Sequence, residues 1–294
     1  MPRRAARDAE RFLVVPPGEE GARPFQATLR GSHEPVVTSF LMRTAPGLVV
    51  ASKYKLEDLV GKGGMGEVWR AFDQSLERPV ALKFIADEVL ERASVRSRFV
   101  AEAKASARLR TPHVVSIYEQ GFFEDTPYIA MELLEGEDLR ARLKRRRRLS
   151  PAEVCVIVDQ VAQGLRIAHA EGIVHRDLKP GNVFLAREGD HETVKLLDFG
   201  VAKLDQGRPS ELTATGEMVG SVYYMSPEQV RGSRALDARA DIWSLGIICY
   251  RALTGRLPFK GESLGDVAVN ICTTDPKSPS ALRPDLPPDL DDFF

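Results

Sequence analysis

The stretches His175-Arg-Asp-Leu-Lys-Pro-Gly-Asn182 and Asp198-Phe-Gly200 decide how the rest of this sequence is interpreted. They place carboxylates, an amide and a lysine in short motifs among strand-like apolar runs. Phosphoryl transfer needs hard oxygen ligands for Mg²⁺, a group that orients the attacking hydroxyl, and cations that offset the developing charge. The pattern therefore favours phosphoryl transfer, with Asp177 accepting the hydroxyl proton and Lys179 neutralising the transferred group.

A glycine-rich stretch, Gly61-Lys-Gly-Gly-Met-Gly-Glu-Val68, lies upstream of these motifs. A strand-like run follows it, whereas a dinucleotide-binding loop would open a helix, and no Lys-Ser/Thr pair follows as in a P-loop. A simple hairpin turn would also use such glycines. A strand–loop–strand flap over a nucleotide remains the functional alternative, because glycines let backbone N–H groups approach phosphates closely.

A lysine inside the apolar run Val80-Ala-Leu-Lys83 is the next unusual feature. Burying an unpaired ammonium group is costly, so the lysine needs a carboxylate partner. Glu102 on the predicted helix 93–109 is the best placed, and the pair would hold nucleotide phosphates. The alternative is an exposed strand lysine.

Taken together and in this order, the motifs resemble the eukaryotic-like protein kinase family, and in particular its bacterial serine/threonine kinases. Two further matches are Ser226-Pro-Glu228, a version of the family's APE motif, and Asp241-Ile-Trp-Ser-Leu-Gly246, which is similar to a central helix. The resemblance covers Tyr54 to the C-terminus. It implies an α+β, two-lobed fold, with a β-rich N-lobe over about 54–134 and a helical C-lobe over about 135–294.

The resemblance also assigns residues to an ATP site. Gly61, Gly63, Gly66 and Val68 would cover the phosphates and adenine, with Ala81 above the ring and Phe184 below it. Lys83 and Glu102 would form an ion pair. Met131 matches the gatekeeper position, and Glu132 and Leu134 match the hinge positions whose backbone bonds adenine.

The family's catalytic roles fall on four residues: Asp177 as base, Lys179 as the cation typical of serine/threonine kinases, and Asn182 and Asp198 as metal ligands. His175, Arg176, Glu228 and Asp241 are assigned structural roles, with Asp241 bonding the backbone of the catalytic loop. Ser221 stands where the family more often has threonine. The implied cofactors are ATP and Mg²⁺, and the implied partners are proteins with Ser or Thr acceptors.

Arg176 beside Asp177 marks, in this family, kinases that are activated by phosphorylation of a loop. Thr213 and Thr215 resemble the paired autophosphorylated threonines of bacterial kinases. A phosphate brings about −1.5 to −2 charges and can pair with an arginine. We therefore predict phosphorylation at one or both, with self-association for reaction in trans. The alternative is that both are ordinary loop residues.

Composition limits the other functional classes. Across 294 residues, 41 basic side chains face 42 acidic ones, for a net charge of −1, so no nucleic-acid partner is expected. No apolar run approaches the roughly 20 residues of a membrane span. The three scattered cysteines fit a reducing compartment, so a cytoplasmic location is expected. The basic run Lys144–Arg148 is either a solvated loop or a docking site for an acidic partner.

Both ends of the chain carry further expectations. Residues 1–50 are predicted to be a flexible extension with at most a short docked segment, and the ordered domain to begin near Tyr54. In the family, helices beyond this C-terminus carry an arginine that pairs with the residue matching Glu228, so the C-lobe is predicted to be truncated. Two alternatives to an active protein kinase follow: a weakly catalytic scaffolding module, and a small-molecule phosphotransferase of related fold.

Overall fold

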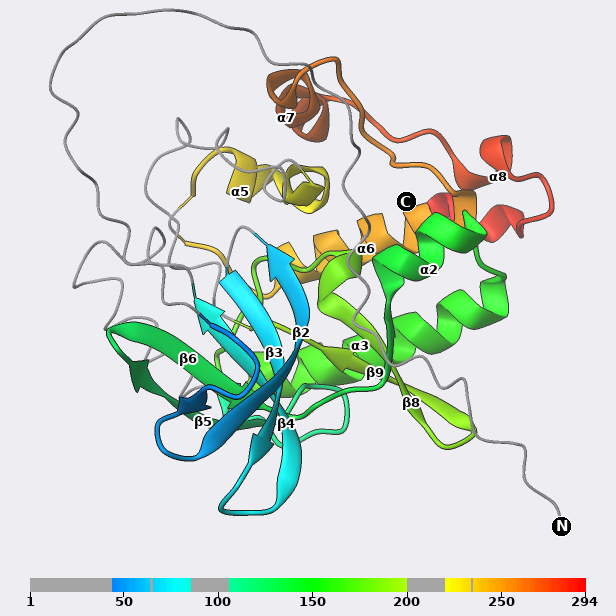
Figure 1. The fold of residues 1–294 in the computed structure, drawn as a ribbon. Coiled ribbons are helices and arrows are strands. Elements are labelled where there is room, and N and C mark those ends of the chain that lie inside the picture. Colours follow the sequence, from blue (N-terminus) through cyan, green and yellow to red (C-terminus); the bar gives the residue numbers. More distant parts are fainter. Residues whose placement is uncertain (1–43, 64–65, 86–105, 200–219, 234) are drawn as a thin grey trace, which may run out of the picture.

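A computed structural model describes residues 44–63, 66–85, 106–199, 220–233 and 235–294 (Figure 1). The first part is a six-stranded antiparallel sheet with the order β1-β2-β3-β4-β6-β5. Its strands are β1 (Val49–Val50), β2 (Tyr54–Gly63), β3 (Gly66–Asp73), β4 (Arg78–Ile85), β5 (Ile117–Phe123) and β6 (Thr126–Met131). The near-continuous apolar run of β4 fits its central place, because residues 80–85 are all buried.

The sheet begins earlier than the sequence predicted. Val49 and Val50 pair with Lys55 and Tyr54, and Gly47 N–H donates to the Leu56 carbonyl. Val50 is fully buried in the N-lobe core. A two-residue strand is too short to show an alternating pattern, which explains why residues 44–50 were assigned to the extension. Residues 1–43 lie outside the described part of the chain.

The second part is mainly helical and carries a small three-stranded sheet with the order β7-β8-β9. Its strands are β7 (Gly136–Asp138), β8 (Val183–Glu188) and β9 (His191–Leu196), and its main helices are α2 (Leu139–Arg146), α3 (Pro151–Ala170), α6 (Arg239–Thr254) and α7 (Leu264–Thr273). Shorter turns are η2 (Pro180–Asn182), η5 (Val222–Tyr224), α5 (Pro227–Val230), α8 (Pro279–Leu282) and η6 (Pro288–Phe293).

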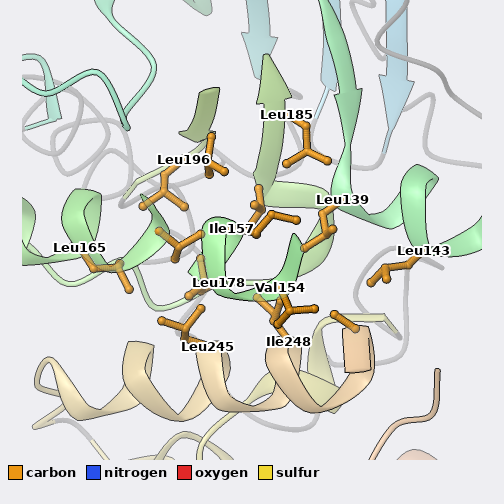
Figure 2. Packing of buried hydrophobic residues seen from close by; sticks show 14 of the residues in the cluster. Leu139, Leu143, Val154, Ile157, Leu165, Leu178, Leu185, Leu196, Leu245 and Ile248 are labelled. Atoms are coloured by element: carbon orange, nitrogen blue, oxygen red, sulfur yellow. The ribbon is translucent and has the colours of Figure 1, made fainter. Parts of the chain in front are cut away.

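The C-lobe core lies where α3 packs between β8–β9 and α6, with the residues labelled in Figure 2. The predicted capping box starts α3, since Ser150 Oγ accepts from Glu153 N–H and Pro151 occupies the first turn. The apolar helix predicted over 241–253 is α6. The predicted helix 93–109 falls largely outside the described residues. Among those described, no helix is long and apolar enough to cross a membrane.

Candidate active site

A cavity of about 430 Å³ opens between the two lobes, and residues from both line it. Most of the predicted ATP-site residues lie on its wall: Gly61, Gly63, Gly66, Val68, Ala81, Lys83, Met131, Glu132 and Leu134. Asp177, Lys179, Asn182 and Asp198 line the same cavity. The structure therefore brings together motifs that are more than one hundred residues apart in the chain, as the 115-residue separation of Lys83 and Asp198 shows.

The wall also includes apolar residues that were not predicted, among them Val60 and Leu197. These two each directly precede a predicted functional residue, Gly61 or Asp198. An apolar side chain at the mouth of a polar motif is the sequence signal that could have identified them. Their place on the wall gives a flat nucleotide base apolar surface on both sides of the cleft.

Phe184 differs from its predicted position below the adenine. It lies on β8 with a solvent exposure of 0% and is not part of the cavity lining. Residues 183–186 are all buried, so both faces of β8 are covered. A fully enclosed side chain offers no surface to a ligand, and Leu197 reaches the cavity instead.

Lys83 contacts Asp198 across the cleft, with its Nζ 2.6 Å from Asp198 Oδ1. Burial alone would raise the pKa of Asp198, but the charge and hydrogen bond of Lys83, together with the charges of His175 and Lys179, hold that pKa below its ordinary value. Asp198 is therefore ionised. Its positive φ of 58°, which aspartate tolerates better than most residues, sets the direction of the carboxylate. The predicted partner of Lys83, Glu102, lies outside the described residues.

The catalytic loop forms one hydrogen-bonded group around Asp177. Lys179 Nζ donates to Asp177 Oδ2 at 2.8 Å and to Ser221 Oγ at 2.7 Å. Asn182 Nδ2 donates to the Asp177 carbonyl at 2.7 Å and to Oδ2 at 3.2 Å. The two bonds to the Asp177 carboxylate both fall on Oδ2, and among the described residues Asp177 Oδ1 has no partner. That oxygen is therefore available to an incoming hydroxyl.

Asp241 anchors the backbone of the catalytic loop. This fully buried carboxylate on α6 accepts from the backbone N–H of His175 and of Arg176, both at 2.8 Å. His169 on α3, which the sequence analysis missed, lies 2.7 Å from Asp241 Oδ2 through its Nε2. Burial raises the pKa of Asp241, but the His169 hydrogen bond and the other donors together lower it below its ordinary value.

His175 links this anchor to the metal-ligand motif. Its Nε2 lies 2.8 Å from the Leu197 carbonyl, directly before Asp198, and its ring packs on Phe199 with centroids 4.6 Å apart. The side chain is fully buried. The catalytic loop and the Asp198 motif are thus positioned by one set of contacts.

The hinge contains a second ion pair that the sequence analysis missed. Glu132 Oε1 lies 2.8 Å from Lys195 Nζ on β9, and Glu132 N–H donates to the Ser116 carbonyl at 2.9 Å. The Lys195 side chain is only 8% exposed. This pair joins the connection between the lobes to the C-lobe sheet at a residue that lines the cavity.

Of the residues predicted to be phosphorylated or to have structural roles around that loop, Arg176 and Glu228 are described. Arg176 Nε is buried and has no hydrogen-bond partner within the described residues, while the Arg176 carbonyl accepts from Gln229 Nε2 at 2.7 Å. Glu228 is half-buried and forms no ion pair with another described residue. Thr213 and Thr215 lie outside the described part of the chain.

The donor set fits a divalent metal. Asp198 Oδ2 and Asn182 Oδ1 are hard oxygens on the cavity wall that the described contacts leave unused. Among the described residues, no group of three or more His, Cys, Asp or Glu gathers around these two oxygens. Mg²⁺ is commonly held in this way, by one or two protein oxygens together with phosphate oxygens and water.

Comparison with known proteins identifies the family to which a chain with this cleft belongs. A family model described as protein kinase domain matches residues 54–290, so the chain belongs to the protein kinase family. The crystal structure of the Mycobacterium tuberculosis PknI kinase domain is similar, with a TM-score of 0.66 and 30% identity over 83% of this chain and 86% of that one. The predicted two-lobed α+β kinase fold is confirmed.

Curated relatives narrow the class to bacterial serine/threonine kinases. The chain is 42% identical over 243 residues to the serine/threonine-protein kinase pkn3 of Myxococcus xanthus. It is 39% identical over 249 residues to the serine/threonine-protein kinase PknA of Mycobacterium tuberculosis strain H37Ra. These alignments cover 81% and 83% of this chain but 44% and 56% of the relatives, so the chain spans about half their length.

Proposed function

We propose that this chain is an ATP- and Mg²⁺-dependent protein kinase that transfers the terminal phosphate of ATP to serine or threonine hydroxyls of proteins. The observation that carries the proposal is the hydrogen-bonded group of Asp177, Lys179 and Asn182 on the same cavity wall as the Lys83–Asp198 pair, with Lys179 also bonded to Ser221. Membership of the protein kinase family and similarity to bacterial serine/threonine kinases support it.

Each residue has a role in phosphoryl transfer that follows from its position in the cavity. Asp177 Oδ1 orients the acceptor hydroxyl and takes its proton, while Lys179, held 2.8 Å from Oδ2, offsets charge on the transferred phosphoryl group. Lys83 on β4 reaches into the cleft from the other lobe and would contact phosphate oxygens. Asn182 and Asp198 would hold Mg²⁺, which supplies electrostatic stabilisation of the phosphate oxygens when bound.

Autophosphorylation of the segment after Asp198 is the finer part of the proposal. Arg176 supports it, because its guanidinium has a buried nitrogen without a described partner, directly beside the catalytic aspartate. A phosphothreonine provides strong acceptor oxygens and negative charge for such a group. We assign Thr213 and Thr215 as the modified residues, with a second copy of the chain as the enzyme.

The test is transfer of labelled phosphate from ATP–Mg²⁺ by the purified chain, compared with Asp177→Asn. Asp190→Asn, an exposed turn residue between β8 and β9, is the matched control. We expect label on wild type and on the control, and at least about a hundredfold less on Asp177→Asn. Equal labelling of all three would refute the proposal.

The phosphorylated positions are found by mass spectrometry of the same samples, with phosphate expected on Thr213 or Thr215. Mixing Asp177→Asn with wild-type chain tests reaction in trans, because the inactive copy then acquires phosphate only from its partner. A thermal shift with ATP–Mg²⁺ but no transfer to any acceptor would favour the scaffolding alternative.

A further inference from the structure

The basic residues of α2 and of the two positions that follow it form two groups that the sequence alone could not separate. Three arginines each contact a carboxylate: Arg142 with Glu137 and Glu192, Arg145 with Glu137, and Arg146 with Glu153. These pairs stabilise the helix on the C-lobe. They account for only part of the basic run.

The second group, which we call the basic stripe, consists of Arg140, Lys144, Arg147 and Arg148, and all four are exposed. Lys144, Arg147 and Arg148 form no ion pair with another described residue. Arg140 has a single one, at 3.4 Å to Asp138, whose carboxylate already accepts the Ala141 N–H at 2.7 Å as the N-cap of α2. The stripe therefore carries positive charge that the described fold leaves uncompensated.

The stripe begins at the catalytic loop. Arg140 lines the same cavity as Asp177, and a Cβ added to Gly181 would lie 3.9 Å from the Arg140 guanidinium. Gly181 lies between Lys179 and Asn182. Lys144 is one helical turn further on and thus shares the face of Arg140, and Arg147 and Arg148 follow at the end of the helix.

Three other cations around the reacting groups are already paired. Lys83 contacts Asp198, Lys179 contacts Asp177, and Lys195 contacts Glu132. The chain as a whole carries a formal charge of only −1, so the excess of positive charge at the stripe is local. A local, solvent-facing charge of one sign selects partners of opposite charge and speeds their encounter.

We propose that the basic stripe selects protein substrates that carry acidic residues on one side of the phosphorylated serine or threonine. The proposal rests on the proposed kinase function, since the stripe would act on the segment that presents its hydroxyl to Asp177. A substrate segment is favoured over RNA or an anionic membrane because Arg140 lies on the wall of the catalytic cavity. The segment that presents its hydroxyl to Asp177 must enter this cavity, whereas RNA and a membrane surface need not.

The experiment uses peptides with one threonine and either glutamates or glutamines on its N-terminal or its C-terminal side, and measures kcat/KM for each. With the wild-type chain we expect one glutamate-containing series to be preferred about tenfold over its glutamine counterpart. Arg140→Gln and Lys144→Gln should each reduce that preference about threefold, a change typical of exposed charge pairs. Raising the salt concentration should reduce it as well.

Arg145→Gln is the matched control, because it removes one charge from the same helix but from a residue paired with Glu137. It should leave the preference within about 1.5-fold of wild type. The double charge reversal Arg140→Glu with Lys144→Glu should favour lysine-containing peptides. Such an inversion cannot result from a loss of folding, which lowers all rates together.

Transfer to the peptides without a preference for glutamate would overturn the stripe proposal while leaving the proposed function intact. Absence of transfer to any peptide would instead count against the proposed function. Binding of phosphatidylserine vesicles or of RNA that the Lys144→Gln change abolishes, with peptide preference unchanged, would assign the stripe to those partners and overturn the proposal.

Discussion

The two sides of the active-site cleft are built in different ways. On the C-lobe side, Asp241, His169 and His175 fix the catalytic loop through hydrogen bonds between α3, α6 and the segment before Asp198. On the N-lobe side, Lys83 forms the bridge to Asp198, and the lobes are otherwise joined at the hinge by the Glu132–Lys195 pair and by hydrogen bonds from residues 106–116. Folding of the C-lobe therefore assembles the proton-accepting group, whereas the nucleotide-facing lysine is held by one ion pair among the described residues.

This difference predicts that Lys83→Met lowers activity strongly but stability little. Lys83 would contact the phosphates, and removal of one such electrostatic group costs about 10²- to 10³-fold in kcat. Asp198, left without its partner, still faces the open cleft with 28% of its side chain exposed, so water can solvate it. Phosphate transfer to a peptide and the thermal midpoint should be measured together.

Lys83→Arg is the matched variant for this comparison, because it keeps the charge and changes the geometry. It should recover part of the activity. A midpoint that falls by more than about 8 °C in Lys83→Met would contradict the view that the N-lobe contact is separable from folding, since that is the shift expected for several kcal/mol in a chain of this size.

Asp241→Ala should show the opposite behaviour, with a loss of stability as its first effect. It leaves two backbone N–H groups and His169 without their acceptor in a fully buried place. Unsatisfied buried groups of this kind cost about 3 kcal/mol in total. Urea unfolding should report this loss, and transfer activity should fall because the catalytic loop is no longer held.

The effect of Asp241 depends on pH in a defined direction. Its pKa is lowered in the folded state, so its contribution is present above the ordinary aspartate pKa of about 3.9 and is lost as the pH falls through the lowered value. The difference in unfolding free energy between wild type and Asp241→Ala should therefore shrink below about pH 4. A difference that grows on acidification would contradict the assignment.

Lys195→Met tests the hinge with a smaller expected effect. The variant removes the partner of Glu132, whose backbone is predicted to bond adenine, and replaces a nearly buried cation with an apolar chain of similar length. We expect the KM for ATP to rise about fivefold while kcat changes less than about twofold, because orientation of the base is affected and the reacting groups are not.

Lys195→Arg should restore the KM for ATP if the ion pair is responsible. A fall in kcat with an unchanged KM would place Lys195 in the chemistry and not in the hinge. The thermal midpoint of each variant serves as the folding control.

The sequence predicts the residues of the cleft best where the contacts between them are local in the chain. Asp177, Lys179 and Asn182 lie within one short motif, so residue types and spacing were enough to place them in one cleft. The ATP-facing strands also carry compact motifs. Their arrangement around one cavity came from the family resemblance, since the motifs are far apart in the chain.

The residues that were missed depend on contacts between distant segments. His169 meets Asp241 72 residues later, and Lys195 meets Glu132 63 residues earlier. A single histidine near the end of a helix carries no pattern that predicts such a contact. Phe184 was misplaced for a related reason, because the burial of both faces of β8 follows from the layers that cover it.

Ser150→Ala completes the comparison as a change remote from the cleft, with the smallest expected effect. It removes the cap of α3, where Ser150 Oγ accepts from Glu153 N–H, and such losses cost about 1 kcal/mol. Hydrogen bonds from Arg146 and Ser150 lower the pKa of Glu153 to about 2. The stability that the ionised Glu153 contributes is therefore present above the ordinary glutamate pKa and is lost as the pH falls toward about 2. Urea unfolding at neutral pH should show the loss while kcat/KM stays within about twofold of wild type. A larger fall in activity would mean that the catalytic loop responds to any loosening of α3, and the separation between the two sides of the cleft would then fail.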